Sequence, residues 1–154
     1  MSDKGTILIV DDSEPHRAVI ARELEKVGYN TATADSGAKA IQAVTQDAID
    51  LVLLDVVMPG LDGFTTLRQL RRNNTTQSLP IIMLTARDDA EDVIQALRLG
   101  ANDYAVKPIR LSELMGRIET HLKLKRGKDE TLGHYRLLGK LGEGAMGIVY
   151  EAEE

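Results

Sequence analysis

The sequence predicts an α/β fold, a doubly wound parallel sheet in which five strands alternate with five helices. Three observations support this prediction. Short apolar runs recur along the chain, segments with helical periodicity lie between them, and polar residues of reactive types follow the runs. Repeated alternation of strand and helix is typical of a parallel sheet with helices on both faces.

Four short apolar runs and one weaker extended stretch are the predicted strands. The runs are 6–10, 50–54, 80–84 and 104–106, and the weaker stretch is 30–34. Residues 51–54, LVLL, show no alternation of apolar and polar positions, which is expected for a strand buried on both faces of a sheet.

Apolar residues at helical spacing predict one helix after each strand. In chain order, the apolar stripes are Val19, Ile20, Leu24 and Val27; Ile41 and Val44; Phe64, Leu67 and Leu70; Val93, Ile94 and Leu97; and Leu111, Leu114, Met115, Ile118 and Leu122. Ser36 is the expected N-cap of the second helix, and Gly28 and Gly100 are expected to end the first and fourth helices.

The composition indicates a folded domain and excludes several kinds of site. Of the 154 residues, 43% are hydrophobic, which is enough for a core, and the formal net charge of −5 argues against nucleic acid as a direct partner. The absence of cysteine excludes thiolate chemistry. His16, His121 and His134 share no metal-ligand spacing and are expected on the surface. Without a basic leader or a long apolar span, we expect a cytoplasmic protein with no membrane partner.

Polar residues at the ends of the predicted strands are where function is expected, because ligands of such sheets bind beyond the carboxyl ends of the strands. These residues are Asp11 and Asp12 after the first strand, Asp55 after the third, Thr85 after the fourth and Lys107 after the fifth. Helix capping or surface exposure would explain each residue alone. Their convergence at one edge of the sheet favours a shared site.

The residue types at this edge fit phosphoryl transfer. Three carboxylates close together repel one another, and a hard divalent cation such as Mg²⁺ relieves that repulsion and can bind a phosphoryl oxygen. Lys107, Thr85 and the backbone N–H of Ala86 could stabilise the other oxygens, while a carboxylate acts as the nucleophile. The expected product is an aspartyl phosphate.

Four motifs closely resemble the receiver domains of bacterial two-component response regulators. They are ILIVDDSE (7–14), DVVMPGLDG (55–63), LTA (84–86) and YAVKP (104–108), and the resemblance spans residues 4–125. It implies a flavodoxin-like sheet of order 2-1-3-4-5 with five helices. It also implies that Asp55 takes a phosphoryl group from a sensor histidine kinase or a phosphotransfer protein, and that the domain catalyses its own phosphorylation and dephosphorylation.

The resemblance also implies a role for each matching residue in binding the metal and the phosphoryl group. Asp12, Asp55 and the backbone carbonyl of Val57 would bind Mg²⁺ directly, and Asp11 would bind it through water. Lys107 and Thr85 would hold the phosphoryl oxygens, with the backbone N–H of Ala86 as a further donor. The peptide bond between Lys107 and Pro108 is expected to be cis.

A switch between two states is implied as well. On phosphorylation, Thr85 would move toward the phosphoryl group and Tyr104 would turn inward, which reshapes the face made by the fourth helix, fifth strand and fifth helix. A homodimer through this face is a further expectation. Asp103 and Arg117 match one charged pair of such dimers, whereas Val93 and Leu124 replace the usual basic partners. Val57 and Arg87, at the pocket mouth, favour a long-lived phosphorylated state.

The end of the sequence resembles a second family. We assign residues 1–126 to the receiver, 127–133 to a linker and 134–154 to the first strands of a bacterial Ser/Thr protein kinase, a short hairpin-like tail. Gly142, Gly144, Gly147 and Val149 match its glycine-rich loop, but the phosphate-binding lysine and the catalytic loop are absent. We therefore expect a longer protein in which the receiver regulates a kinase.

Three alternatives remain open. The first is a docking module with a receiver fold that is not phosphorylated. The second is a nucleotide-binding kinase fragment, which the missing lysine disfavours. The third is a flavin-binding protein of similar fold, which the acidic residues after the first strand disfavour.

Overall fold

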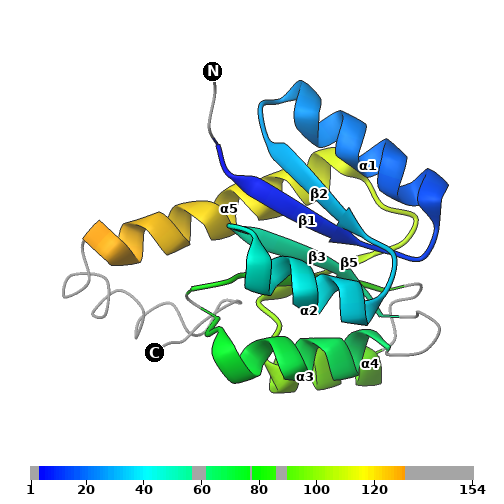
Figure 1. Cartoon of the computed structure of the whole chain (residues 1–154), viewed down its shortest axis with the longest axis vertical. Coiled ribbons are helices and arrows are strands. Elements are labelled where there is room, and N and C mark those ends of the chain that lie inside the picture. The colour runs from blue at the N-terminus through cyan, green and yellow to red at the C-terminus, as the bar shows by residue number, and fades with distance from the viewer. Residues whose placement is uncertain (1–3, 57–61, 77, 86–89, 131–154) are drawn as a thin grey trace. The chain divides into compact units, whose positions relative to one another are not determined.

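A computed structural model describes residues 4–56, 62–76, 78–85 and 90–130 of the chain (Figure 1). Several predictions concern residues outside these ranges. They are the Val57 carbonyl, the Ala86 N–H, the Arg87 side chain, and the kinase-like tail with Gly142, Gly144, Gly147 and Val149. These predictions stay untested by the structure.

The predicted alternation of strands and helices is confirmed. The elements are β1 Thr6–Val10, α1 Glu14–Lys26, β2 Asn30–Ala34, α2 Gly37–Gln46, β3 Leu51–Asp55, α3 Gly63–Asn73, β4 Ile81–Thr85, α4 Ala90–Leu99, β5 Asp103–Val106 and α5 Leu111–Glu130. All neighbouring strands run parallel, and the sheet order β2-β1-β3-β4-β5 is the expected one. β3 and β4 each lie one residue later than predicted, so Asp55 and Thr85 are the last residues of their strands.

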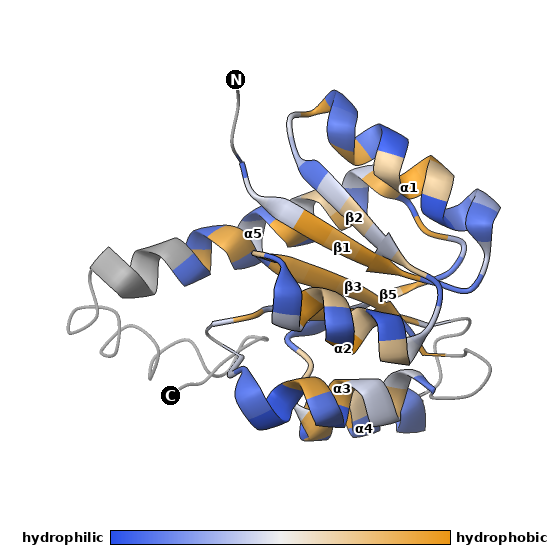
Figure 2. Ribbon diagram, viewed as in Figure 1, coloured by the Kyte–Doolittle hydropathy of each residue, from blue (hydrophilic) through white to orange (hydrophobic). Residues whose placement is uncertain are grey.

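The sheet is the middle of three layers. Helices α1 and α5 cover one face, and α2, α3 and α4 cover the other (Figure 1). Every residue of β3 and of β4 is buried, as the unbroken apolar run LVLL predicts. Figure 2 shows the resulting pattern, with apolar strands inside and polar residues on the outer sides of the helices. Burial of the two apolar faces therefore holds the strand ends in fixed positions.

Local signals set several helix ends as predicted. The Ser36 hydroxyl accepts from the Lys39 N–H at 3.2 Å and caps α2. Gly28 and Gly100, with φ of 105° and 113°, follow α1 and α4 in the left-handed region that favours glycine. At the start of α1 the cap is Ser13, which accepts from the His16 N–H at 3.4 Å. Neither aspartate of the acidic pair is therefore used as that cap.

Two of the predicted apolar stripes leave large apolar side chains exposed to solvent. In α1, Ile20 and Leu24 are buried, whereas Val19 is 43% exposed and Val27, the residue that caps the end of the helix, is 39% exposed. In α4, Ile94 and Leu97 are 49% and 46% exposed, and the buried residue is the small Ala96. Each of these helices rests on the sheet by a narrow face, so residues at the sides of the stripe remain in solvent.

The Cα positions divide the chain into two compact units, Met1–Leu122 and Lys123–Glu154. The predicted limits of receiver, linker and tail stay predictions. Among the described residues, no helix combines the length and apolar character that crossing a bilayer requires.

Candidate functional site

The parallel pairing of β1 with β3 brings three carboxylates together. Val10 lies opposite Leu54, so the residues that follow them, Asp11 and Asp55, leave the sheet side by side. Asp12 is next in the chain, and one carboxylate oxygen from each of the three aspartates lies within 4.8 Å of the others. The cluster predicted from the sequence is therefore formed by the fold.

The three carboxylates differ in their surroundings. Asp11 and Asp55 are 1% and 3% exposed, whereas Asp12 faces solvent. Asp11 Oδ1 accepts from the Ser13 N–H at 2.9 Å, but Asp11 Oδ2 is buried and has no hydrogen-bond partner among the described residues. His16 Nδ1 lies 3.4 Å from that oxygen on a side chain that is 60% exposed. A buried carboxylate oxygen without a hydrogen bond is costly unless it binds a cation.

Lys107, which follows the outermost strand β5, places a positive charge beside Asp11 and Asp55. Its Nζ lies 2.9 Å from Asp55 Oδ2 and 4.0 Å from Asp11 Oδ2. The peptide bond from Lys107 to Pro108 is cis, as expected. An ammonium group thus lies in contact with the carboxylate that the resemblance identifies as the nucleophile.

Thr85 completes the row of strand ends. Asp55 lies opposite Leu84 in the β3–β4 pair, which places Thr85 one residue beyond Asp55 on the next strand. Thr85 is 2% exposed, and its carbonyl accepts from the Lys107 N–H at 2.7 Å. Asp55, Thr85 and Lys107 therefore come from three adjacent strands at one edge.

Gly63 has a structural role that the sequence reasoning missed. Its N–H donates to Val56 O at 2.9 Å, and a Cβ at this position would lie 2.2 Å from Asp55 O and 2.7 Å from Val56 Cα. Asp62, just before it, caps α3 by accepting from the Thr65 N–H at 2.8 Å. The Asp-Gly pair that ends the motif DVVMPGLDG could have indicated this role. Only glycine lets α3 begin against the end of β3.

The donor set fits a hard divalent cation. All three candidate ligands are carboxylates, and one of their buried oxygens accepts no hydrogen bond from the residues that the structure describes. Oxygen-only ligands are what Mg²⁺ prefers in proteins. The acidic cluster thus has the chemistry to hold such an ion beside Asp55.

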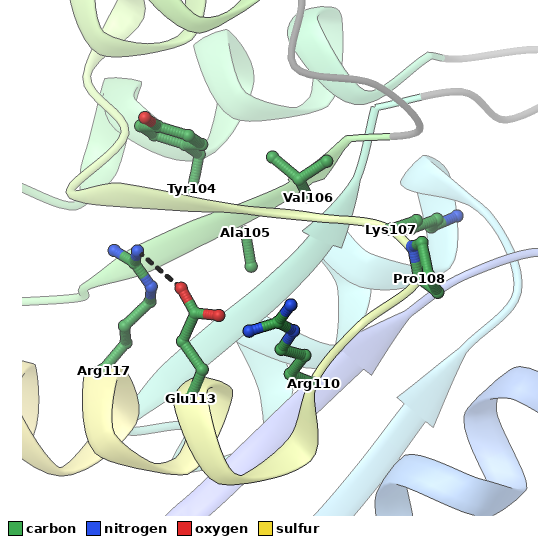
Figure 3. A pocket seen from close by; sticks show the side chains of 8 residues that line it. All are labelled: Tyr104, Ala105, Val106, Lys107, Pro108, Arg110, Glu113 and Arg117. Atoms are coloured by element: carbon green, nitrogen blue, oxygen red, sulfur yellow. Dashed lines mark hydrogen bonds and ion pairs between the residues drawn. The ribbon is translucent and has the colours of Figure 1, made fainter.

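A second group of polar residues lies along β5 and α5 (Figure 3). Arg117 Nη1 donates to Asp103 Oδ1 at 2.7 Å and its Nη2 to Glu113 Oε2 at 3.0 Å. The guanidinium also lies 5.9 Å from the centre of the Tyr104 ring. Asp103 and Arg117, expected as partners across a dimer, are therefore paired within one chain.

His121 joins this group, which corrects the expectation of a surface histidine. Its side chain is 15% exposed and its Nε2 lies 3.0 Å from Asp103 Oδ2. Burial opposes ionisation of Asp103. The hydrogen bonds from His121 and from the Tyr104 N–H, with the charge of Arg117, outweigh it and hold the Asp103 pKa below its ordinary value. In turn, Asp103 and Glu113 outweigh the effect of burial and raise the pKa of Arg117.

Residues 7–119 match the family model of the response regulator receiver domain. The chain belongs to this family. The receiver is 41% identical over 133 residues to the uncharacterized transcriptional regulatory protein YkoG of Bacillus subtilis, covering 86% of this chain and 58% of YkoG. It is 42% identical over 124 residues to the Vibrio cholerae protein named "Probable cyclic di-GMP phosphodiesterase", covering 80% of this chain and 28% of that one.

Solved structures agree with this assignment. The receiver domain of the Francisella response regulator 1452 matches with a TM-score of 0.72 and 32% identity, over 77% of this chain and 97% of that one. The receiver is therefore a phosphoacceptor domain of two-component signalling. The chain spans only 58% and 28% of the lengths of YkoG and the Vibrio protein.

Proposed function

We propose that Asp55 accepts a phosphoryl group from a phosphohistidine on a sensor histidine kinase or phosphotransfer protein, with Mg²⁺ bound directly by Asp12 and Asp55 and through water by Asp11. The observation that carries this proposal is the contact of Lys107 Nζ with Asp55 Oδ2 at 2.9 Å, beside three carboxylates whose oxygens lie within 4.8 Å. The proposed nucleophile, the proposed metal ligands and a counter-charge therefore lie together at the carboxyl ends of the strands.

Each residue has a distinct part in the transfer. An Asp55 oxygen attacks the phosphorus, the bond to the histidine nitrogen breaks, and the imidazole keeps that electron pair. The Lys107 ammonium group lies beside Asp55 and stabilises the negative charge on one phosphoryl oxygen, and the Thr85 hydroxyl donates a hydrogen bond to another. Mg²⁺, when bound, neutralises charge on the transferring group and orients it. The backbone carbonyl of Val57 and the N–H of Ala86 are further proposed contacts.

The test uses acetyl phosphate as a small phosphodonor. We expect the intact mass of the wild-type chain to increase by one phosphoryl group in the presence of Mg²⁺, and not in the presence of EDTA. Asp55→Asn should show no adduct. Asp47→Asn, which changes an exposed aspartate at the end of α2, is the matched control and should be labelled like the wild type.

The absence of an adduct in the folded wild type would contradict the proposal. It would favour the alternative of a docking module with a receiver fold. Labelling of Asp55→Asn at the wild-type level would instead place the acceptor elsewhere.

We further propose that phosphorylation moves Thr85 and Tyr104, reshapes the α4–β5–α5 face, and so regulates an attached Ser/Thr kinase. Support for the kinase is the glycine-rich sequence of the tail alone. The relatives named above have other outputs. A kinase assay on the longer protein, with and without acetyl phosphate, tests this step; equal activity in both would contradict it. A homodimer through this face, a long-lived phosphoryl group and a cytoplasmic location also stay predictions.

A further inference from the structure

Asp11 is held by hydrogen bonds at all of its polar atoms but one. Its N–H donates to Ala34 O at 3.1 Å, and its side-chain Oδ1 accepts from the Ser13 N–H at 2.9 Å. Its carbonyl oxygen accepts from Arg17 Nη1 at 2.7 Å. The remaining atom, Oδ2, is buried and has no hydrogen-bond partner among the described residues. Asp11 is therefore fixed with a single oxygen left for a cation or for a water bound to it.

The carbonyl that Arg17 holds belongs to the peptide bond between Asp11 and Asp12. Both aspartates are members of the acidic cluster, in which one oxygen from each of Asp11, Asp12 and Asp55 lies within 4.8 Å of the others. Because a peptide bond is planar, the orientation of this one sets the directions in which the chain and the two flanking side chains leave β1. A donor fixed on its oxygen therefore acts on two of the three carboxylates together.

Arg17 reaches this carbonyl because of its place in α1. Ser13 caps the helix, and the Arg17 N–H donates to Ser13 O at 3.1 Å, so Arg17 lies in the first turn. Side chains of a helix lean toward its N-terminus, which directs the Arg17 guanidinium back to the end of β1. The contact therefore joins the start of the helix to the end of the strand that carries the acidic pair.

Two other basic side chains lie near Asp11, but they face its carboxylate rather than its main chain. His16 Nδ1 lies 3.4 Å from Asp11 Oδ2, on a side chain that is 60% exposed, and Lys107 Nζ lies 4.0 Å from the same oxygen. Both approach the oxygen that a cation would use. Arg17 is half-buried and, within the described part of the chain, forms no ion pair. Its guanidinium thus holds the acidic pair without occupying a carboxylate oxygen.

We propose that Arg17 is a positioning residue of the metal site. By holding the Asp11 carbonyl, it fixes the directions of Asp11 and Asp12 and so raises the affinity of the acidic cluster for a divalent cation. This role rests on the proposed function, because it takes the acidic cluster as the cation site. Arg17 acts through the two aspartates and contacts neither the ion nor the phosphoryl group.

The test measures binding of Mn²⁺, which prefers the same oxygen ligands as Mg²⁺, to the whole unphosphorylated chain, with the free ion counted by electron paramagnetic resonance. Arg17→Met keeps much of the side-chain length but loses the donor, and its affinity for Mn²⁺ should fall about tenfold or more. The sign is decisive, because removal of a nearby positive charge would by itself strengthen cation binding. Arg22→Met makes the same charge change at an exposed arginine of α1 and should bind Mn²⁺ like the wild type.

Further measurements separate positioning from a loss of folding. Circular dichroism confirms that each variant is folded. Arg17→Lys can still donate one hydrogen bond to the Asp11 carbonyl and should regain part of the affinity for Mn²⁺ that Arg17→Met loses. With Mg²⁺ at a saturating concentration for each variant, the rate of labelling by acetyl phosphate should approach that of the wild type, because Asp55 and Lys107 are unchanged.

Any of four results would overturn this role of Arg17. They are wild-type affinity of Arg17→Met for Mn²⁺, an equal loss of affinity in Arg22→Met, a folded Arg17→Lys that binds as weakly as Arg17→Met, and labelling of Arg17→Met that stays slow at saturating Mg²⁺. The last would mean that the arginine acts on Asp55 rather than on the metal ligands.

Labelling of the wild type by acetyl phosphate, on the same preparation, separates this role from the proposed function. A wild type that is labelled, with an Arg17→Met variant that keeps its affinity for Mn²⁺, leaves the proposed function standing and removes the role of Arg17. A wild type that binds Mn²⁺ more tightly than Arg17→Met but takes no phosphoryl group does the reverse.

Discussion

At Gly63 the absence of a side chain allows the main chain of α3 to contact the main chain at the end of β3, next to Asp55. We expect Gly63→Ala to lower the free energy of unfolding by about 1–3 kcal/mol, because its Cβ would overlap Asp55 O and Val56 Cα. The yield of phosphorylated chain should also fall, since the displaced main chain belongs to Asp55, the proposed acceptor. Denaturant unfolding and intact mass after acetyl phosphate measure the two effects.

Gly116 is the matched control within the same chain. It lies inside α5, and a Cβ there would have no atom within 4 Å. Gly116→Ala should raise stability by about 0.5–1 kcal/mol, because alanine favours the helix and nothing is displaced. Equal effects of the two substitutions would show that close approach at Gly63 is unimportant.

The sequence was sufficient to predict which residues form the candidate site, but it could not predict which atoms contact one another there. The residue types of Asp11, Asp55 and Lys107, together with their places at the ends of predicted parallel strands, were sufficient to group them at one site. The contact of Lys107 with Asp55, the orphan oxygen of Asp11 and the need for glycine at 63 depend on interatomic distances. Sequence periodicity contains no such information.

Between elements, Arg71 at the end of α3 joins three segments at the side of the sheet opposite the site. Its guanidinium donates to Gly100 O at 2.7 Å, to Leu79 O at 2.8 Å and to Asn102 Oδ1 at 2.7 Å. Burial lowers its pKa to about 10. Asn102 Oδ1 in turn accepts from the Ile81 N–H at 3.0 Å, at the start of β4. The side chain therefore ties α3 to the start of β4 and to the connection between α4 and β5.

We expect Arg71→Ala to lower the free energy of unfolding by about 3 kcal/mol, because several buried oxygens lose a charged donor together. Arg72→Ala changes the neighbouring, exposed arginine and should alter stability by less than about 0.5 kcal/mol. Urea unfolding of both variants tests the difference. Similar midpoints for the two would contradict a tether through Arg71.

The Asp103 group, which joins β5 to α5, predicts a pH dependence. The pKa of Asp103 is lowered in the folded chain, so its stabilising effect is present above the unfolded pKa of about 4 and is lost as pH falls through the folded value. The stability difference between the wild type and Asp103→Asn should thus shrink in acid, as the pH falls below about 4. Asp35→Asn, at an exposed ion pair with Lys39, should differ little from the wild type throughout. A difference for Asp103→Asn that grows in acid would contradict this assignment.

The order and type of the strands and helices were predicted accurately, but the buried faces of the helices were predicted less well. The alternation of strands and helices gave all ten elements of the observed order. In α4, Ile94 and Leu97 of the predicted stripe nevertheless lie largely in solvent, because the helix contacts the core through Ala96 and Leu99. A single sequence does not show which side of a stripe faces the sheet, since a small residue there packs as well as a large one.

For the whole molecule, the parallel arrangement of all five strands explains why the site was predictable. Carboxyl ends of parallel strands meet at one edge, so residues distant in the chain converge there without any local signal. The process that the receiver regulates was not predictable in the same way. It depends on partners and on sequence beyond the receiver, and the relatives of this chain carry different ones.

One residue, Asp55, is proposed to receive the phosphoryl group. After labelling with acetyl phosphate and Mg²⁺, reduction with sodium borohydride converts a phosphorylated aspartate to homoserine, which tandem mass spectrometry locates in the sequence. We expect homoserine at position 55 alone. Homoserine at Asp11, Asp12 or Asp62 instead, or at no position in a chain that has gained a phosphoryl group, would contradict it.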